Sequence, residues 1–130
     1  MKFLCTVLVL IYSLNVVPEV QYGQASYYHS KFEGRKAADG SVFSNQEFTC
    51  ATGKEYPFLT ELRITNTKNN KSVIVFVTDR GSFSYKYPKR KVDLSQKAFR
   101  AISSSGGLKE GLLNVKIEVV SLPEKNKTKN

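Results

Sequence analysis

The stretch Val75-Phe-Val-Thr-Asp79-Arg80-Gly81 leads an apolar run of β type into one carboxylate, one arginine and one glycine. We expect a strand here, with Asp79 at the rim of a sheet, where side chains face a groove rather than a core. The glycine allows a sharp turn or a close approach to a ligand. Two further segments, Gly23-Gln-Ala-Ser-Tyr-Tyr28 and Val92-Asp-Leu-Ser95, flank this stretch in the chain, and the order of the three makes it informative.

The pattern around this stretch predicts short strands and one helix. The strands are expected at residues 24–28, 61–66, 72–78, 92–94 and 113–120, where apolar and polar residues alternate or form a buried run. Residues 96–102 are expected to form a helix capped by Ser95 or Asp93, and a turn is expected at Asn69-Asn70. Residues 29–60 are mostly irregular, with one short turn expected at 44–48. Such a long loop in a compact domain usually lines a site.

This arrangement favours a small β-barrel, because the strands are short and lack a βαβ rhythm. A β-sandwich is the alternative on pattern alone. The chain of 130 residues has room for one small domain. Closing the sheet would hide its edges, which would otherwise be free to pair with other chains.

The N-terminal residues resemble an export signal, with Met1-Lys2 followed by an apolar run up to Leu14. An uncleaved anchor is the alternative. We expect a signal peptide at 1–23 with an unclear cleavage site, a barrel domain at 24–120 and a basic disordered tail at 121–130. Cys5 comes too early in the run for a lipoprotein signal. Export without disulfides predicts a bacterial periplasm or cell envelope.

Few residues offer metal or thiol chemistry. Outside the leader, Cys50 is alone, and we expect a small buried hydrophobe rather than a nucleophile. His29 is the only histidine, and no zinc or calcium spacing occurs, so neither metal nor other cofactor is expected. The formal net charge of +9 predicts attraction to envelope polyanions. Nucleic-acid binding is a weaker hypothesis, because no base-reading motif is present.

Taken together, the segments resemble the RlpA-like (rare lipoprotein A) family, whose domain is a six-stranded double-psi β-barrel with one or two short helices. The resemblance runs from about Gly23 to Val120. It is carried by the three segments above together with Phe32-Glu-Gly-Arg-Lys36 and Leu62-Arg-Ile-Thr-Asn66. It implies that the chain binds peptidoglycan and, as in several members, cleaves its glycan strands as a lytic transglycosylase.

The resemblance assigns the catalytic role to Asp79, which matches the aspartate of the family's Asp-Arg-Gly segment. Two expected partners differ. Ser41 stands where the family has a functional glutamate, and Thr52 stands where it has a histidine, beside an apparent one-residue insertion. The family's Pro-Phe-Gly is Pro57-Phe58-Leu59 here.

The candidate substrate-binding residues each have a second interpretation. Arg80 could hold a substrate carboxylate or be a solvated charge, and Asp39 before Gly40 is also a common turn pair. Tyr27 and Tyr28 could stack on sugar rings, although strand neighbours face opposite sides and one of them should be core. Ser41 and Thr52 could hydrogen-bond sugar hydroxyls. Asp79 itself could be structural, accepting backbone N–H groups or pairing with an arginine. Asp93 is interpreted as a helix cap.

Two functions follow from the resemblance. The first is an exported endolytic transglycosylase that cleaves between MurNAc and GlcNAc and leaves 1,6-anhydro ends. The substrate's own hydroxyl is the nucleophile in this reaction, so a single acid–base residue suffices. The alternative is a non-catalytic, expansin-like glycan-binding barrel that has lost its catalytic partners. In both cases we expect a monomer that binds glycan strands.

Overall fold

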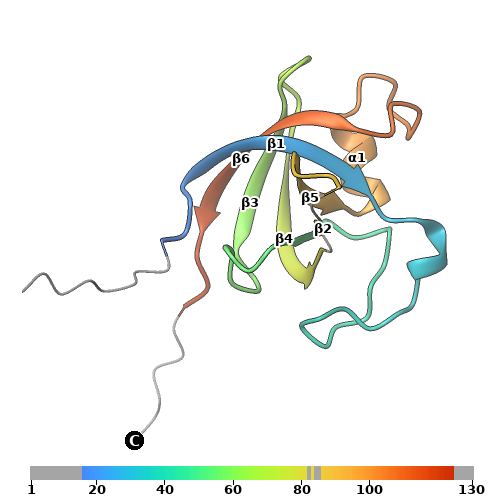
Figure 1. The fold of residues 1–130 in the computed structure, drawn as a ribbon. Coiled ribbons are helices and arrows are strands. Elements are labelled where there is room, and N and C mark those ends of the chain that lie inside the picture. The colour runs from blue at the N-terminus through green and yellow to red at the C-terminus, as the bar shows by residue number, and fades with distance from the viewer. Residues whose placement is uncertain (1–15, 82, 84–85, 125–130) are drawn as a thin grey trace, which may run out of the picture.

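The computed structural model describes residues 16–81, 83 and 86–124. Six strands form a closed barrel with neighbours in the order β1-β5-β2-β4-β3-β6 (Figure 1). The strands and helices are β1 (Val20–Tyr27), η1 (a 3-10 helix, Ser30–Phe32), β2 (Thr49–Thr52), β3 (Glu61–Asn66), β4 (Ser72–Arg80), β5 (Arg90–Leu94), α1 (Gln96–Ile102) and β6 (Leu113–Ser121). The predicted barrel is confirmed, and the sandwich is not adopted.

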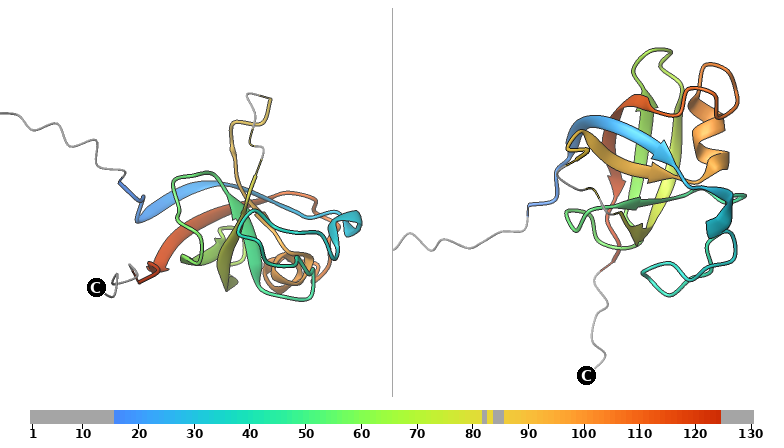
Figure 2. Two further views of the ribbon diagram at one scale, coloured as in Figure 1. Left: turned by 90° about the horizontal axis from the view of Figure 1, so that it is seen from below. Right: turned by 45° about the vertical axis from the view of Figure 1, so that its right-hand side comes forward.

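The barrel contains two parallel strand pairs, β1 with β5 and β2 with β4. The antiparallel pair β2 and β5 joins them, and β3 and β6 close the ring. Figure 1 and Figure 2 show α1 against one end of the barrel and the β1–β2 connection extending beyond the strands. Both described chain ends lie together, away from that connection.

Apolar side chains fill the barrel because alternate residues of each strand point inward. Burial alternates along β3, where Leu62 and Ile64 are inaccessible while Arg63 is exposed. Phe99 and Ile102 of α1 pack against the same core. The other large core residues are Tyr56, Val75, Val77, Val92, Leu94, Val115 and Ile117.

Gly23 allows a close crossing between β1 and the segment that leads into β5. A Cβ atom at this position would lie 2.4 Å from Lys91 Cγ and 2.9 Å from the Lys89 carbonyl oxygen. The Gln24 N–H donates to that same Lys89 oxygen over 2.7 Å. The close packing of β5 and the residue before it against β1 therefore requires a glycine at position 23.

Strand β2 was not expected, because it lies inside the segment interpreted as irregular. Its four residues are small or polar and show no alternation, yet its last three are buried between β4 and β5. β1 also begins at Val20, before the expected boundary at 24, and pairs with β6 from its first residue. The predicted strand at 61–66 and helix at 96–102 match the structure.

Of the two residues predicted to cap the helix, only Ser95 does so. Ser95 is the N-cap of α1, and its hydroxyl accepts from the Ala98 N–H over 3.2 Å. Asp93 does not cap the helix, because it lies within β5 and its side chain faces another direction. Among the described residues, no helix is long and apolar enough to cross a membrane.

Candidate active site

A row of four small or polar residues crosses four neighbouring strands at one end of the barrel. In the strand register Ser26 pairs with Asp93, Asp93 with Ala51, and Ala51 with Asp79. Residues in register on adjacent strands project to the same face of a sheet. The two aspartates therefore lie on either side of Ala51, and its single methyl group leaves space between them.

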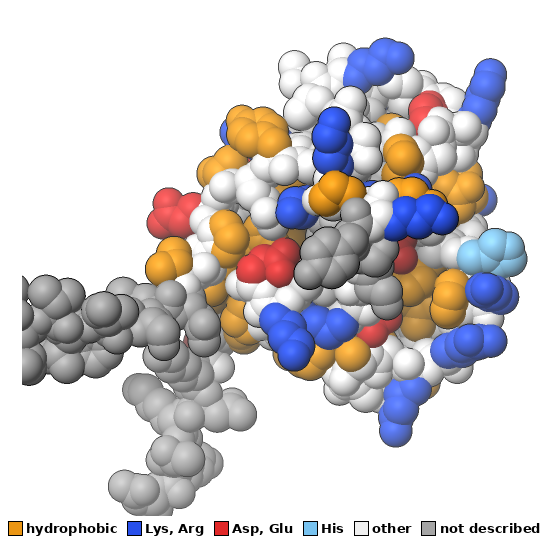
Figure 3. All heavy atoms as spheres, viewed as in Figure 1, with side chains coloured by type: hydrophobic (Ala, Val, Ile, Leu, Met, Phe, Trp, Pro, Cys, Tyr) orange, Lys and Arg blue, Asp and Glu red, His pale blue; other side chains and the backbone are white. Residues whose placement is uncertain are grey.

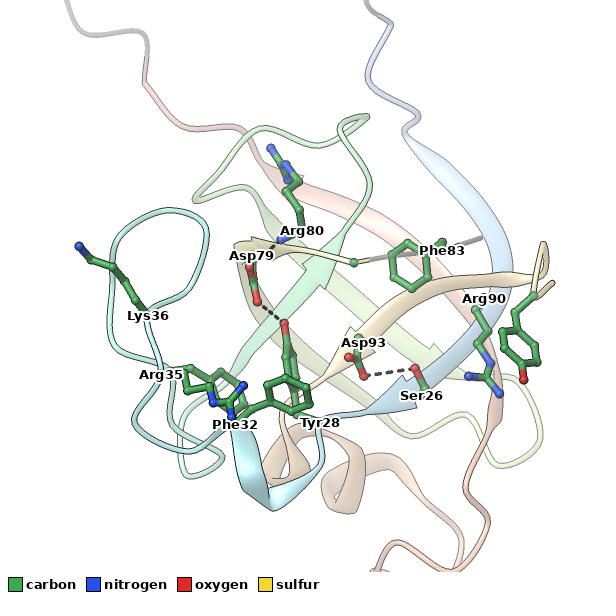
Figure 4. A pocket seen from close by; sticks show the side chains of 13 residues that line it. Ser26, Tyr28, Phe32, Arg35, Lys36, Asp79, Arg80, Phe83, Arg90 and Asp93 are labelled. Atoms are coloured by element: carbon green, nitrogen blue, oxygen red, sulfur yellow. Dashed lines mark hydrogen bonds between the residues drawn. The ribbon is translucent and has the colours of Figure 1, made fainter. Parts of the chain in front are cut away.

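Three donors hold the Asp79 carboxylate. Oδ1 accepts from the backbone N–H groups of Ala38 and Arg80, each over 2.9 Å. Oδ2 accepts from the Tyr28 hydroxyl over 2.6 Å (Figure 4). Among the described residues the carboxylate forms no ion pair, because the only one found joins Lys116 and Glu118. Asp79 is thus fixed by hydrogen bonds, and Arg80 contributes its N–H group rather than its charge.

The long β1–β2 connection is ordered and docks against Asp79. The Phe43 N–H donates to the Arg35 carbonyl oxygen over 2.7 Å, and the Gly34 N–H donates back to the Phe43 oxygen over 2.9 Å. The Asp39 N–H donates to the carbonyl oxygen of Thr78 in β4 over 3.0 Å. These bonds place the loop as one wall of the site, as its length predicted.

Asp93 has a different environment. It is largely buried, and the Ser26 hydroxyl donates to its Oδ1 over 3.2 Å. Burial raises the pKa of this carboxyl to about 6, and the negative charge of Asp79 acts in the same direction, whereas Ser26 and Arg90 oppose the rise. A substantial fraction of Asp93 is therefore protonated in weakly acidic solution.

Tyr28 contacts the β1–β2 connection, Asp79 and helix α1. Its ring packs on Phe43, with centroids 4.2 Å apart, and edge-on against Phe32. Burial, followed by the hydrogen bond to Asp79, raises the pKa of its phenol well above the usual range. Gln96 of α1 donates to the Tyr28 carbonyl oxygen over 2.9 Å, which ties the helix to this position. Tyr28 thus acts as a neutral donor to Asp79.

A hollow of about 490 Å³ opens above the two aspartates. We call it the aspartate hollow. Its lining combines the two carboxylates with four cations and several aromatic rings. The lining residues are Ser26, Tyr28, Phe32, Arg35, Lys36, Phe43, Asp79, Arg80, Gly81, Phe83, Tyr87, Arg90 and Asp93.

The arginines of the hollow lie against aromatic rings. The Arg90 guanidinium lies 4.1 Å from the Tyr87 ring centroid, and that of Arg35 lies 5.4 Å from Phe32. Figure 4 shows Arg35 and Arg90 on opposite sides of the aspartates. Figure 3 shows lysine and arginine side chains spread over one face of the molecule, with acidic side chains between them. The hollow thus offers acid–base groups flanked by positive charge.

The predicted binding residues Asp39 and Ser41 lie on another side of the loop. They line a separate depression with Val42 and Phe76, and neither lines the aspartate hollow. Asp39 Oδ1 accepts from the N–H and the hydroxyl of Ser41, which is the geometry of a local turn. Ser41 therefore does not supply a polar group beside Asp79.

Tyr27 and Thr52 are also outside the hollow. Tyr27 packs edge-on against Phe99 with centroids 4.9 Å apart, so it contacts the core, as one tyrosine of the pair was expected to do. Thr52 is fully buried, and its hydroxyl donates to the Gly53 carbonyl oxygen over 2.9 Å. In this structure a substrate cannot reach it.

Arg80, which was predicted to contact substrate, lines the edge of the hollow, where its side chain is anchored. Its Nη1 donates to the Gly53 carbonyl oxygen over 3.3 Å, and its guanidinium lies 4.0 Å from the Phe58 ring centroid. Figure 4 shows the side chain directed away from Asp79. Tyr28 lines the hollow through its hydroxyl rather than through an exposed ring face.

Sequence reasoning did not single out Ser26 or Arg90, and it interpreted Asp93 as a helix cap rather than as a residue that lines the hollow. The signal was present, because Ser26 and Asp93 occur in two of the three segments singled out. Their juxtaposition depends on the parallel pairing of β1 with β5, which sequence alone does not reveal. Cys50 is buried as expected, and burial raises the pKa of its thiol far above the usual range. No cluster of three metal-ligating side chains occurs in the described part of the chain.

Comparison with known proteins places this chain in a family. A family model described as lytic transglycolase matches residues 20–117. The chain belongs to the lytic transglycolase family. An endolytic peptidoglycan transglycosylase RlpA of Haemophilus influenzae is 43% identical over 101 residues, which cover 78% of this chain and 33% of the relative. That of Neisseria meningitidis serogroup A is 41% identical over 107 residues, 82% of this chain and 42% of the relative.

The lytic transglycolase domain thus corresponds to about a third to two fifths of these relatives. Solved structures share its fold. An apo expansin of Clavibacter michiganensis has a TM-score of 0.60 at 23% identity and covers 82% of this chain and 52% of that one. A Streptomyces papain inhibitor has a TM-score of 0.61 at 17% identity, with coverages of 81% and 97%. The predicted family and double-psi barrel are confirmed.

Proposed function

We propose that this chain is an endolytic peptidoglycan transglycosylase. It would cleave the glycan strand between MurNAc and GlcNAc and leave a 1,6-anhydro end. The proposal is carried by one observation, the pair Asp79 and Asp93 on either side of Ala51 on the floor of the aspartate hollow. The relatives named as peptidoglycan transglycosylases support the choice of substrate.

The reaction needs only proton transfers from the protein. The C1–O4 bond breaks, the leaving O4 of GlcNAc takes one proton, and the 6-hydroxyl oxygen of MurNAc attacks C1 and loses one. Because the nucleophile belongs to the substrate, its high effective concentration replaces an activated water. The two carboxyl groups of the hollow are sufficient for both proton transfers, even though Ser41 and Thr52 replace the family's glutamate and histidine.

The walls of the hollow suit a sugar chain that carries carboxylates. Phe83 and Tyr87 provide apolar surface for sugar rings, and Arg35, Lys36 and Arg90 provide cations for lactyl or peptide carboxylates. Arg80 is less available, because it is anchored on Gly53. Binding should therefore weaken with increasing salt.

The alternative proposal is a barrel that binds glycan without cleaving it. It is favoured by the burial of Thr52 and by the turn geometry of Ser41, since neither position supplies the family's second catalytic group. The two proposals predict the same groove and the same partner. They differ only in whether a bond is broken.

Digestion of purified glycan strands distinguishes the transglycosylase from the binding barrel. We expect the wild-type chain to release fragments with 1,6-anhydro ends, detected by mass spectrometry. Asp79→Asn should abolish release while strands are still pulled down. Glu118→Gln, on the outside of β6, is the matched control and should cleave normally. Intact binding without any anhydro product from wild-type protein would support the binding barrel instead.

We also propose that the chain is exported to the bacterial envelope, where such a substrate lies. The proposal is supported by the apolar run that ends at Leu14, which lies outside the described residues. The basic tail is only partly described, because residues 125–130 also lie outside this range.

A further inference from the structure

We propose that Asp93 is the catalytic acid of this site and that Asp79 is the carboxylate that accepts the second proton. This assignment rests on the proposed transglycosylase function and divides its two proton transfers between two named residues. It differs from the sequence-based assignment, in which Asp79 carried both. The structure supports it through the contacts, the burial and the position of Asp93.

The hydrogen bonds of the two aspartates differ. Asp79 accepts from Tyr28, Ala38 and Arg80, so every partner of its carboxylate is a donor. A carboxylate has about four acceptor positions, so one is left for a substrate hydroxyl. An acid that donates a proton to the leaving oxygen needs an oxygen free of competing donors. Asp93 meets this condition, because its Oδ1 accepts from Ser26 alone and its Oδ2 has no protein partner among the described residues.

The surroundings of Asp93 act on its charge in both directions. Burial and the like charge of Asp79 favour its neutral form, whereas Ser26 and Arg90 favour its charged form. The balance leaves its pKa at about 6, which suits a group that must be protonated before each reaction. The other charged or titratable residues lining the hollow are Tyr28, Arg35, Lys36, Arg80 and Tyr87.

The two aspartates lie on either side of one small residue. Asp93 and Asp79 pair with the two sides of Ala51, so their Cα atoms are two strand spacings apart, or about 10 Å. Their side chains project to the same face, and Ala51 adds almost no bulk between them. A glycosidic bond lying over Ala51 would have one carboxyl group on each side.

The step then balances without water. Asp93 gives its proton to O4 as the C1–O4 bond breaks, and O4 keeps the electron pair of that bond. The 6-hydroxyl oxygen forms the C1–O6 bond, and its proton passes to Asp79. Afterwards Asp93 regains a proton and Asp79 loses one through solvent, so the enzyme returns to its starting state.

Titration of the free protein tests the assignment without any substrate. The chain has only three aspartates, so their side-chain carboxyl signals can be assigned by NMR through single substitutions. We expect the Asp93 signal to titrate with a midpoint near 6. In Asp79→Asn the midpoint should fall, because the like charge is gone. A midpoint near the usual aspartate value of about 4 in the wild-type chain would overturn the assignment.

The pH profile of cleavage gives the second readout. The rate of anhydro-end formation should fall as pH rises above about 6, because Asp93 must be protonated. Asp93→Asn should lower the rate by about 10²–10⁴-fold. Glu118→Gln should keep both rate and profile. A thermal melt checks folding, and the Asn side chain can still accept from Ser26.

The outcomes distinguish failure of the proposed function from failure of the assignment of Asp93. If the wild-type chain forms no anhydro ends, the proposed function fails, while the titration still reports on Asp93. If wild type cleaves and Asp93→Asn cleaves equally well, the function stands and the assignment of Asp93 is wrong. Cleavage by wild type that is lost in both Asp79→Asn and Asp93→Asn supports the division of roles.

Discussion

Asp79 and Asp93 are the same residue type in the same hollow, but their neighbours give them different chemistry. Three donors surround the carboxylate of Asp79, whereas Asp93 is largely buried, accepts from one hydroxyl donor and lies in a hollow shared with another carboxylate. A buried acid whose charged form is disfavoured lowers the stability of the folded protein once it ionises. Asp93 should therefore reduce stability in neutral solution.

The first prediction concerns the free energy of unfolding of Asp93→Asn. The folded-state pKa of Asp93 is about 6, above the unfolded value of 3.8, so the folded state binds more protons between these values. Stability contributed by the protonated carboxyl is full below about pH 4 and is lost as pH rises through 6. At pH 7 the variant should be more stable than wild type by up to about 3 kcal/mol.

Urea unfolding at pH 4 and pH 7 measures this difference. The gain should be present at pH 7 and small at pH 4, because the wild-type residue is then largely protonated and resembles Asn. A variant that is destabilised equally at both pH values would show that Asp93 has a structural role instead.

Leu59 illustrates a second constraint at the residue scale. Its backbone has a φ of +68°, in the left-handed region, and its side chain is 55% exposed. The resemblance described above implies a glycine at this position, and glycine adopts that conformation readily. A non-glycine residue in this conformation costs about 1–2 kcal/mol of stability. Replacing it with glycine would remove that cost, but the greater freedom of glycine in the unfolded chain offsets part of the gain.

We therefore predict that Leu59→Gly raises the free energy of unfolding by up to about 1 kcal/mol, since the exposed side chain contributes little packing. Asn70→Gly is the matched control. Asn70 also has a positive φ, of 59°, but asparagine tolerates this region, so the gain should be smaller. Thermal melts compare the variants, and a larger gain at Asn70 than at Leu59 would contradict the explanation.

At the scale of elements, the crossing at Gly23 holds β1 against the segment entering β5. A methyl group there would lie too close to Lys91 and to the Lys89 backbone. We predict that Gly23→Ala lowers the free energy of unfolding by about 1–3 kcal/mol through overpacking.

Gly107→Ala tests whether the effect belongs to this crossing. A Cβ atom at Gly107 would meet nothing nearer than 3.8 Å, and its φ lies outside the left-handed region. The free energy of unfolding of the Gly107→Ala variant should therefore differ little from that of the wild-type chain. Equal losses in the two variants, measured by urea unfolding, would show that the crossing at Gly23 is not specially tight.

The elements that sequence reasoning predicted correctly are those with a local signal. β3 alternates over its whole length, and α1 has a serine cap and an apolar face. β2 has no such signal, because it is short and its burial depends on the neighbours on both sides. The same limit applies to the site. Asp79 was singled out from its motif, whereas the placement of Asp93 beside it across Ala51 depends on strand order.

At the scale of the whole molecule, the closed barrel bears on where a leader could be removed. The first residues of β1, from Val20 to Gly23, pair with residues 115–118 of β6. Cleavage after Gly23, at the predicted boundary, would remove these four residues from the ring. We predict that a signal peptidase cuts before Val20 instead. N-terminal sequencing of the exported protein measures the site, and a mature chain beginning at Gln24 would contradict this prediction.

The central claim is that the aspartate hollow breaks a glycan strand without using water. Digestion of purified strands in water enriched in heavy oxygen tests it most directly. We predict that the wild-type chain releases anhydro ends, each lighter than a reducing end by one water, with no heavy oxygen incorporated. Fragments with reducing ends that carry the heavy isotope would show hydrolysis and contradict the account, as would the absence of any cleavage.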